Sequence, residues 1–358
     1  MPAWYASALQ DPVLRWALYV IAALAVVTLL TMVQVLVLSE LGARRLARRQ
    51  QFEAAWRPRL AEATAHSQSP PPWAPPEPGE RLWFLLLWCR TQRQLRGEAH
   101  ARLNRLLVDY GLHRVAHALL GRRQVHLRLI ALAVLRQVGG PESWNDVARF
   151  LAHRNPFLSL AAAEVLVTLD PHRAMAGVLP VVVVRRDWTP QRIAALCRVA
   201  GRTAVSAPLL AALRNAAPER EHRLAGLAAW ADPARLAGWA RDVLGGPRDP
   251  RVHQAALQVL GELRDAADRP LLLAAIADPD ADVRLAALKA LRKQAVLAEL
   301  DTLCALLPDP SWAVRQEAAD TIAAQPGFDR LALEQLIETV DDRYGQDALR
   351  RAIAERHP

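Results

Sequence analysis

The sequence predicts an all-α protein, an α-solenoid of helical hairpins with a period of about 31 residues, preceded by one N-terminal transmembrane helix. Three observations predict this fold class. A long apolar run lies near the N-terminus, a proline-rich segment follows it, and the rest of the chain repeats one helical pattern built on alanine and leucine. We therefore expect a membrane anchor, a connecting segment and a repeat domain, in that order.

Residues 16–38 form the apolar run, which has no charged side chain and only Thr28, Thr31 and Gln34 as polar residues. As a helix the run is about 34 Å long, which is enough to cross the ~30 Å hydrocarbon core of a bilayer. It is longer than the apolar core of a secretory signal peptide, and no small-residue cleavage motif follows it. We therefore expect a retained transmembrane helix.

The basic residues around this run predict its orientation. Four arginines follow the run closely: Arg44, Arg45, Arg48 and Arg49. On the other side, Arg15 is offset by Asp11. Because basic flanks stay on the cytoplasmic side, we expect residues 1–15 outside, with Trp4 and Tyr5 at the outer interface, and the later chain in the cytoplasm of a bacterium, at its inner membrane. Attraction of anionic lipid is an additional role for the four arginines.

The segment after the anchor is read as a basic juxtamembrane helix, residues 39–66, and a linker, residues 67–80. Six prolines lie between positions 70 and 78. Proline fixes φ and removes a backbone donor, so this stretch is expected to be an extended spacer of about 28 Å. The linker predicts a domain boundary before the repeat domain, residues 81–358. A proline-rich segment also suits aromatic grooves of partner proteins, which is the alternative.

The start of the repeat domain has a short apolar stretch, residues 82–89, followed by three arginines, which are Arg90, Arg93 and Arg96. Eight residues are too few to span a bilayer. Two interpretations remain open: a buried first helix of the domain, or an amphipathic element on the membrane surface with Trp83 and Trp88 at the headgroups.

The repeat has seven copies. They start at Leu127, Leu158, Gln191, His222, Val252, Val283 and Val314. Four residues on, each copy has a small residue: Ala131, Ala162, Ala195, Gly226, Ala256, Ala287 and Ala318. Eight residues on, each has a bulky one: Leu135, Leu166, Val199, Trp230, Leu260, Leu291 and Ile322. These steps keep both positions on one helix face, and a second apolar helix lies between copies. One hairpin cannot bury both faces alone, so the hairpins should stack into a solenoid.

One polar column runs through the repeats, directly after each start: Arg128, Ser159, Arg192, Arg223, His253, Arg284 and Arg315. Such side chains either bond the loops of adjacent hairpins as a structural ladder or line the concave face as a basic stripe for an acidic partner. For the second role, seven arginines are the candidate partner-binding residues: Arg90, Arg93, Arg96, Arg192, Arg223, Arg284 and Arg315.

The segments DADVRLAALKAL, residues 280–291, and DPSWAVRQEAADTI, residues 309–322, resemble HEAT-like repeats of the phycobilisome-lyase type. The whole layout resembles bacterial HEAT repeat proteins with an N-terminal membrane anchor, some of which are associated with neighbouring glycosyltransferases. This resemblance implies a protein–protein interaction scaffold with a membrane-associated partner, for which a glycosyltransferase is the candidate.

No catalytic residue, cofactor site or metal site is predicted. The chain has no Walker loop, no GxSxG, no HExxH and none of the His-Glu pairs of proteins similar to deoxyhypusine hydroxylase. His113 and His117 are four residues apart but have no third ligand nearby. Three scattered cysteines argue against disulfides and for a reducing compartment. An enzyme with a site in the concave groove remains an alternative.

Nucleic-acid binding is the second alternative, and the charge distribution argues against it. Residues 127–358 have 29 basic and 28 acidic side chains, a net charge of +1, whereas nucleic-acid-binding domains are usually strongly basic.

Overall fold

The structure is a computed structural model that describes residues 12–65, 73–294 and 300–356. Within these ranges the long regular elements are α-helices and no strand occurs, so the predicted all-α fold is confirmed. The chain divides into two compact units, residues 1–116 and 117–358. Trp4 and Tyr5, the predicted interfacial residues, lie outside the described residues.

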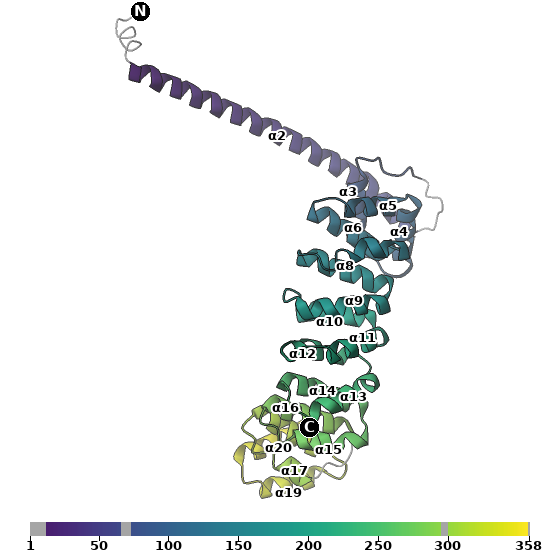
Figure 1. Ribbon diagram of the computed structural model, residues 1–358, viewed down its shortest axis with the longest axis vertical. Helices are drawn as coiled ribbons and strands as arrows, with labels where there is room; N and C mark the ends of the chain where they lie inside the picture. Colours follow the sequence, from purple (N-terminus) through teal and green to yellow (C-terminus); the bar gives the residue numbers. More distant parts are fainter. Residues whose placement is uncertain (1–11, 66–72, 295–299, 357–358) are drawn as a thin grey trace, which may run out of the picture. The chain divides into compact units, whose positions relative to one another are not determined.

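The described part of the first unit begins with one long helix, α2 (Pro12–Ala65), which contains the apolar run (Figure 1). No part of its most apolar stretch is buried, and the helix is long and apolar enough to cross a membrane. Thr28 Oγ1 donates to Leu24 O, and Thr31 Oγ1 donates to Thr28 O, so both hydroxyls are satisfied within the helix. This local bonding suits an environment without water.

The C-terminal part of α2 packs against α3 (Arg81–Gln92) and α4 (Gly97–Asp109). Phe52, Trp56 and Leu60 are four residues apart, share one helix face and are all buried. Trp56 meets the ring of Phe84 edge to face, with ring centroids 4.9 Å apart. Trp88 is fully buried and its Nε1 donates to Leu103 O at 2.9 Å.

This burial decides between the two interpretations of residues 82–89. Trp88 lies inside the three-helix module of α2, α3 and α4 and therefore cannot lie at lipid headgroups. The unit boundary also differs from the expected boundary at residues 67–80, because residues 81–116 belong to the same unit as α2. The large rings on α2 need apolar partners, and α3 and α4 supply them.

Three hydrogen bonds from two side chains, Arg102 and Tyr110, stabilise this module. Arg102 Nη1 donates to Thr64 O and Ala65 O, at 3.1 and 2.6 Å, and so bonds the last carbonyls of α2, where a cation is favoured. Tyr110 Oη donates to Trp73 O at 3.0 Å, which bonds the proline-rich segment to the module.

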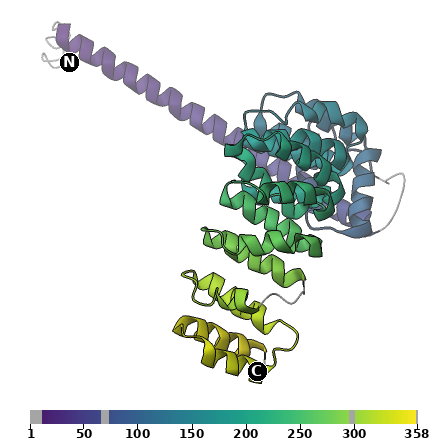
Figure 2. The same ribbon diagram turned by 60° about the horizontal axis from the view of Figure 1, so that its bottom comes forward.

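The second unit is a stack of helical hairpins with two layers of helices (Figures 1 and 2). The boundary between the units falls within α5 (Leu112–Leu120). Layer A contains α6 (Val125–Val138), α8 (Pro156–Leu169), α10 (Pro190–Ala200), α12 (Pro218–Ala225), α14 (Pro250–Leu263), α16 (Ala281–Gln294), α18 (Trp312–Ala323) and α20 (Arg343–Arg356). Layer B contains α7 (Trp144–Ala148), α9 (Pro171–Val184), α11 (Arg202–Arg214), α13 (Pro233–Leu244), α15 (Arg269–Ala275), α17 (Leu300–Cys304) and α19 (Arg330–Thr339). Three short 3₁₀ turns connect some of them: η1 (Pro141–Ser143), η2 (Ala228–Trp230) and η3 (Ala266–Asp268).

Two layer A helices, α8 and α14, begin where the sequence supplies a capping side chain followed by proline. Asn155 Oδ1 accepts hydrogen bonds from two backbone N–H groups of α8, and Asp249 Oδ1 accepts one from Arg251 N in α14. Proline follows each cap at the first helical position, where its missing N–H costs nothing. These local signals fix the starts of α8 and α14.

The packing positions follow the predicted register in five of the seven repeats. The small residues there are buried: Ala131, Ala162, Ala256, Ala287 and Ala318. Gly261 shows how close the helices come, since a Cβ at this position would lie 2.8 Å from Ala290 Cα on α16. Alanine and glycine are therefore required by the distance between neighbouring helices rather than by helix propensity.

The third and fourth repeats depart from that register, and the alignment at Gln191 and His222 is corrected here. The buried face of α10 consists of Ile193, Leu196, Cys197 and Ala200, whereas Val199 is 63% exposed. The buried residues of α12 are Glu221, Leu224 and Ala225, and the helix ends before Gly226. The equivalent first positions are therefore 193 and 221. In an alanine-rich helix two faces are apolar enough to be buried, and the sequence pattern selected the wrong one.

Candidate functional site

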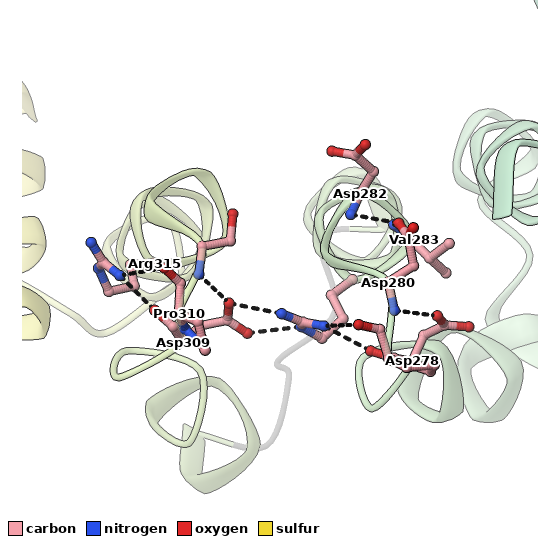
Figure 3. Close-up of polar contacts among 10 residues, drawn as sticks. Asp278, Asp280, Asp282, Val283, Asp309, Pro310 and Arg315 are labelled. Carbon is pink, nitrogen blue, oxygen red and sulfur yellow. Dashed lines mark hydrogen bonds and ion pairs between the residues drawn. The ribbon is translucent and has the colours of Figure 1, made fainter.

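Figure 3 shows the clearest polar cluster in the second unit, which includes Asp278, Asp309 and Arg315. Arg284 lies at its centre. Its Nε and Nη2 donate to the two carboxylate oxygens of Asp309 at 2.8 and 2.9 Å, and its Nη1 donates to Asp278 O at 2.8 Å and Pro279 O at 3.0 Å. Its side chain is only 13% exposed. Arg284 thus joins the loop before α16 to the loop before α18.

The next repeat uses the same geometry. Arg315 Nη1 donates to Asp309 O at 2.6 Å and Pro310 O at 3.2 Å, the loop in front of its own helix, as Figure 3 shows. Its guanidinium carbon lies 5.1 Å from the centre of the Tyr344 ring. This repetition indicates that the polar column bonds the loops of consecutive hairpins.

Shorter column residues perform the same task with fewer bonds. Ser159 Oγ donates to Leu151 O, and His253 Nε2 lies 3.1 Å from Gly246 O, each in the preceding loop. At the other end of the column, Arg128 lies over the Phe150 ring. The structural-ladder interpretation therefore describes these positions, and the guanidinium groups of Arg284 and Arg315 are already engaged within the chain.

The cluster also determines how Asp309 ionises. Burial alone would raise the pKa of Asp309, but hydrogen bonds from Arg284 and from the backbone N–H of Ser311 outweigh it and hold the pKa below the usual value. The same contact with Asp309 raises the pKa of Arg284. Both groups are therefore charged at neutral pH, and their interaction stabilises the fold.

Arg192 and Arg223 do not occupy the ladder position, because the register of their helices differs. Arg192 precedes the first buried residue of α10, and its side chain is 65% exposed at 3.8 Å from Glu164. Arg223 lies two residues after Glu221, and its Nη2 donates to Arg185 O at 2.6 Å. Their inclusion in the column was wrong, although both line hollows on the layer A side.

The remaining predicted arginines belong to the first unit. Arg90, at the end of α3, has a 55% exposed side chain whose Nη1 lies 3.5 Å from Glu53 Oε2. Arg93 and Arg96 are exposed at the two ends of the loop between α3 and α4. Arg44, Arg45 and Arg48 are exposed on α2, whereas Arg49 pairs with Glu53 at 3.0 Å. The structure does not bring the Arg44–Arg49 group and the ladder together in one unit.

A hollow on the layer A side forms where the fourth repeat is incomplete. Because α12 has only eight residues, its main neighbours on one side are α9 and α11, and the space beside α10 is left open. This hollow has a volume of about 660 Å³ and is lined by residues of α10, α12 and α14. A second hollow of about 640 Å³, lined by α14 and α16, shares His222, Gly226 and Arg251 with the first. We call the two together the basic groove.

The basic groove contains functional candidates that sequence reasoning missed. Its cationic lining residues are Arg186, Arg223, Arg251, Lys289 and Lys293. Only one carboxylate, that of Asp282, lines it. A signal was present in the sequence, because Lys289 and Lys293 are the only lysines among 45 basic residues and lie one helical turn apart.

Ser143, His117 and Asp146 form a hydrogen-bonded row that has the connectivity of a hydrolase triad. Ser143 Oγ lies 3.1 Å from His117 Nε2, and His117 Nδ1 lies 3.2 Å from Asp146 Oδ2. The burial is the reverse of what catalysis needs, because Ser143 is fully buried while the Asp146 side chain is 48% exposed. The row offers no accessible nucleophile and instead fixes the turn before α7.

The other reactive side chains are also shielded or scattered. Within the described ranges, no three His, Cys, Asp or Glu side chains gather closely enough to hold a metal ion. None of the three cysteines, Cys89, Cys197 and Cys304, is in a disulfide bond. Burial raises the pKa of Cys197 to about 12 and also raises that of Cys304, so neither thiol is activated as a nucleophile.

Comparison with known proteins identifies repeats in the C-terminal part of the chain. Residues 270–356 match the family model of HEAT repeats, which confirms the predicted HEAT-like repeats over this stretch. No curated protein sequence matches the chain significantly. Among solved structures, the chain is similar to one described as an engineered protein, with 15% identity, a TM-score of 0.34, and coverage of 82% of this chain and 87% of that one.

Proposed function

We propose that this chain is a non-catalytic interaction scaffold, anchored in a membrane by α2, whose second unit docks another membrane-associated protein. The observation that carries the proposal is the division of α2 into two halves. The N-terminal half leaves its apolar side chains exposed, whereas Phe52, Trp56 and Leu60 in the C-terminal half are buried in the first unit. An exposed apolar helix of this length needs a bilayer or a partner to cover it.

The orientation follows from the arginines beside the apolar half. Arg44, Arg45 and Arg48 are exposed and follow the apolar run, so they favour a cytoplasmic position for the C-terminal half of α2. In this proposal the N-terminus faces outward, and both the three-helix module and the repeats lie in the cytoplasm of a bacterium, at its inner membrane. The same arginines lie where anionic headgroups would attract them.

The attachment of the anchor within the first unit supports a stable tether. Arg102 bonds the end of α2, and the aromatic rings hold α3 and α4 against it. A membrane anchor confines a binding surface near other membrane proteins and raises its effective concentration toward them. The repeats provide the extended surface that solenoids use for binding.

The partner is proposed by class. A membrane-associated protein fits the anchored geometry, and a polysaccharide-type glycosyltransferase is the candidate implied by the resemblance to membrane-anchored HEAT repeat proteins. The exposed arginines Arg90, Arg93, Arg96 and Arg192 are available for its polar contacts.

The topology is tested with reporters fused after the last residue of the full chain. We expect a fluorescent protein that matures only in the cytoplasm to be active there and an alkaline phosphatase, which needs the periplasm, to be inactive. Changing Arg44, Arg45, Arg48 and Arg49 together to Glu should reduce or invert this preference, because the positive flank is lost. Phosphatase activity in the unaltered chain would contradict the proposal.

The partner class is tested by cross-linking the full chain in native membranes and identifying the captured proteins. The comparison variant carries Leu30→Arg and Val33→Arg, which should prevent insertion, and the control carries Leu30→Ile and Val33→Leu. We expect the control, but not the arginine variant, to capture a membrane-associated protein. Capture of no membrane-associated protein by the unaltered chain would overturn the scaffold proposal.

A further inference from the structure

The basic groove departs from the charge balance of the unit that contains it. Residues 127–358 have 29 basic and 28 acidic side chains, whereas the groove is lined by five cationic side chains and one carboxylate. The surplus of positive charge is therefore local. It is concentrated where α12 is shortened and the helix stack is open.

Several groove cations have no close carboxylate partner among the described residues. Lys293 pairs with Glu262 at 2.5 Å, and Arg223 donates to a backbone carbonyl. In contrast, no described carboxylate lies within 4.0 Å of Arg186, Arg251 or Lys289. All three side chains belong to exposed residues. Three cations with no described carboxylate within 4.0 Å, distributed over the two hollows of the groove, attract an anionic ligand and repel a cationic one.

The rest of the groove lining combines apolar side chains with the amide groups of Gln191, Gln254 and Gln258. Ile193, Leu227 and Leu285 lie among the cations. Trp188 also lines the groove, is only 2% exposed, and its Nε1–H has no acceptor among the described residues. The lining thus suits a ligand that combines acidic groups, carbonyl oxygens and an apolar group.

We propose that the basic groove binds an acidic peptide segment that contains at least one large apolar residue. The inference rests on the proposed scaffold function and names the part of the partner that is recognised. Carboxylates of the segment pair with Arg186, Arg251 and Lys289, and its apolar side chain packs on Ile193 and Leu227. The groove extends over four layer A helices, which at 8–10 Å each corresponds to roughly 25–30 Å, or about eight extended residues.

A nucleic acid fits this surface less well. Its phosphates continue at regular spacing, so it needs a basic track longer than the groove. The next hollow along layer A contains Glu164, which lies 2.7 Å from Arg136 and 3.8 Å from Arg192 and neutralises much of the charge there. A short acidic peptide bound in the groove does not reach the hollow that contains Glu164, so the neutral charge there does not weaken its binding.

The experiment uses the full chain in detergent micelles and an array of random decapeptides. We expect the bound peptides to be enriched in Asp, Glu and large apolar residues. The triple variant Arg186→Glu, Arg251→Glu and Lys289→Glu should bind the selected peptides at least about tenfold more weakly. The matched control, Arg214→Glu and Arg235→Glu, changes exposed arginines of layer B and should bind as the unaltered chain does. Circular dichroism melting checks that each variant is folded.

A second measurement reports on the groove directly. Reductive ¹³C-methylation labels only Lys289, Lys293 and the α-amino group, and it preserves the positive charge. We expect a selected acidic peptide to shift the Lys289 methyl resonance and to leave the α-amino resonance unchanged. An uncharged Asn and Gln counterpart of the peptide should shift neither.

Several outcomes would overturn the inference. They are a bound set with no enrichment in acidic residues, equal binding by the groove variant, or an unchanged Lys289 resonance. Tighter binding of a single-stranded decanucleotide than of the acidic peptides, with the same dependence on the groove, would replace the peptide with nucleic acid. If the groove binds no acidic peptide but cross-linking captures a membrane-associated partner, the scaffold proposal stands and the groove proposal is wrong. If the groove binds acidic peptides but cross-linking captures no membrane-associated protein, only the scaffold proposal is wrong.

Discussion

The two units of the molecule bury their cores in different ways. In the first unit, Phe52, Trp56, Phe84 and Trp88 fill a module that occurs once. In the second unit, Ala131, Ala162, Ala256, Ala287 and Ala318 recur at the same place in the repeat. Large rings can fill an irregular space between a few helices, whereas small residues allow each helix to approach the next at the same distance. The three-helix module, which occurs once, is therefore filled by large aromatic residues, whereas the repeated helices of the second unit are packed through small ones.

The hydrogen bonds of the arginine side chains also occur once in the first unit and recur in the second. In the first unit Arg102 bonds the end of one helix, and this contact occurs once. In the second unit Arg284 and Arg315 bond loops at equivalent positions of consecutive repeats. A core substitution in the first unit should therefore destabilise the whole three-helix module, while one in the second unit should destabilise mainly the contacts between neighbouring repeats.

The largest expected effect comes from Trp88→Ala. Removing a fully buried indole should destabilise the first unit by about 3–5 kcal/mol, because it leaves a cavity and also loses the hydrogen bond to Leu103 O. Hydrogen exchange should accelerate in α3 and α4 while α14 and α16 keep their protection. Trp312→Ala, at a side chain that is 66% exposed on α18, is the control and should change little. Equal loss of protection in both units would contradict the separation.

A smaller effect is expected from Ala287→Leu in the second unit. Ala287 is fully buried, and the larger side chain should cost about 1–3 kcal/mol by overpacking. Local hydrogen exchange should increase in α14, α16 and α18, because these helices contact one another. Ala211→Leu, at an exposed position of α11, should be nearly neutral. Equal stability of the two variants would argue against the repeat register at this helix.

The smallest effect is a pH dependence of the ladder. The folded-state pKa of Asp309 is lowered, so its contribution is fully present above the unfolded-state value of about 3.9 and is lost as the pH falls through the folded-state pKa. Asp309→Asn should therefore reduce the unfolding free energy by about 1–2 kcal/mol at neutral pH. The difference from the unaltered chain should shrink below about pH 4. A constant difference between pH 7 and pH 2 would exclude the ionised pair as its source.

Much of the fold could be predicted because it is encoded locally. The apolar run, the Asn-Pro and Asp-Pro caps, and the recurrence of small residues each depend on neighbours within a few positions. The polar column could also be predicted from the sequence, because Arg284 and Arg315 occupy equivalent positions in two regular repeats. Its role required the fold, because Asp309 lies 25 residues after Arg284 in the sequence.

The sequence by itself determined the helical-hairpin repeat and the apolar N-terminal helix, because helix periodicity and capping act over a few residues. Only the tertiary structure decided which face of α10 is buried, that α12 stops before Gly226, and that α3 packs on α2. In each case two local arrangements are similar in hydrophobicity, and distant side chains select one of them. The basic groove arises from that selection, since its cations come from separate helices that only the fold brings together.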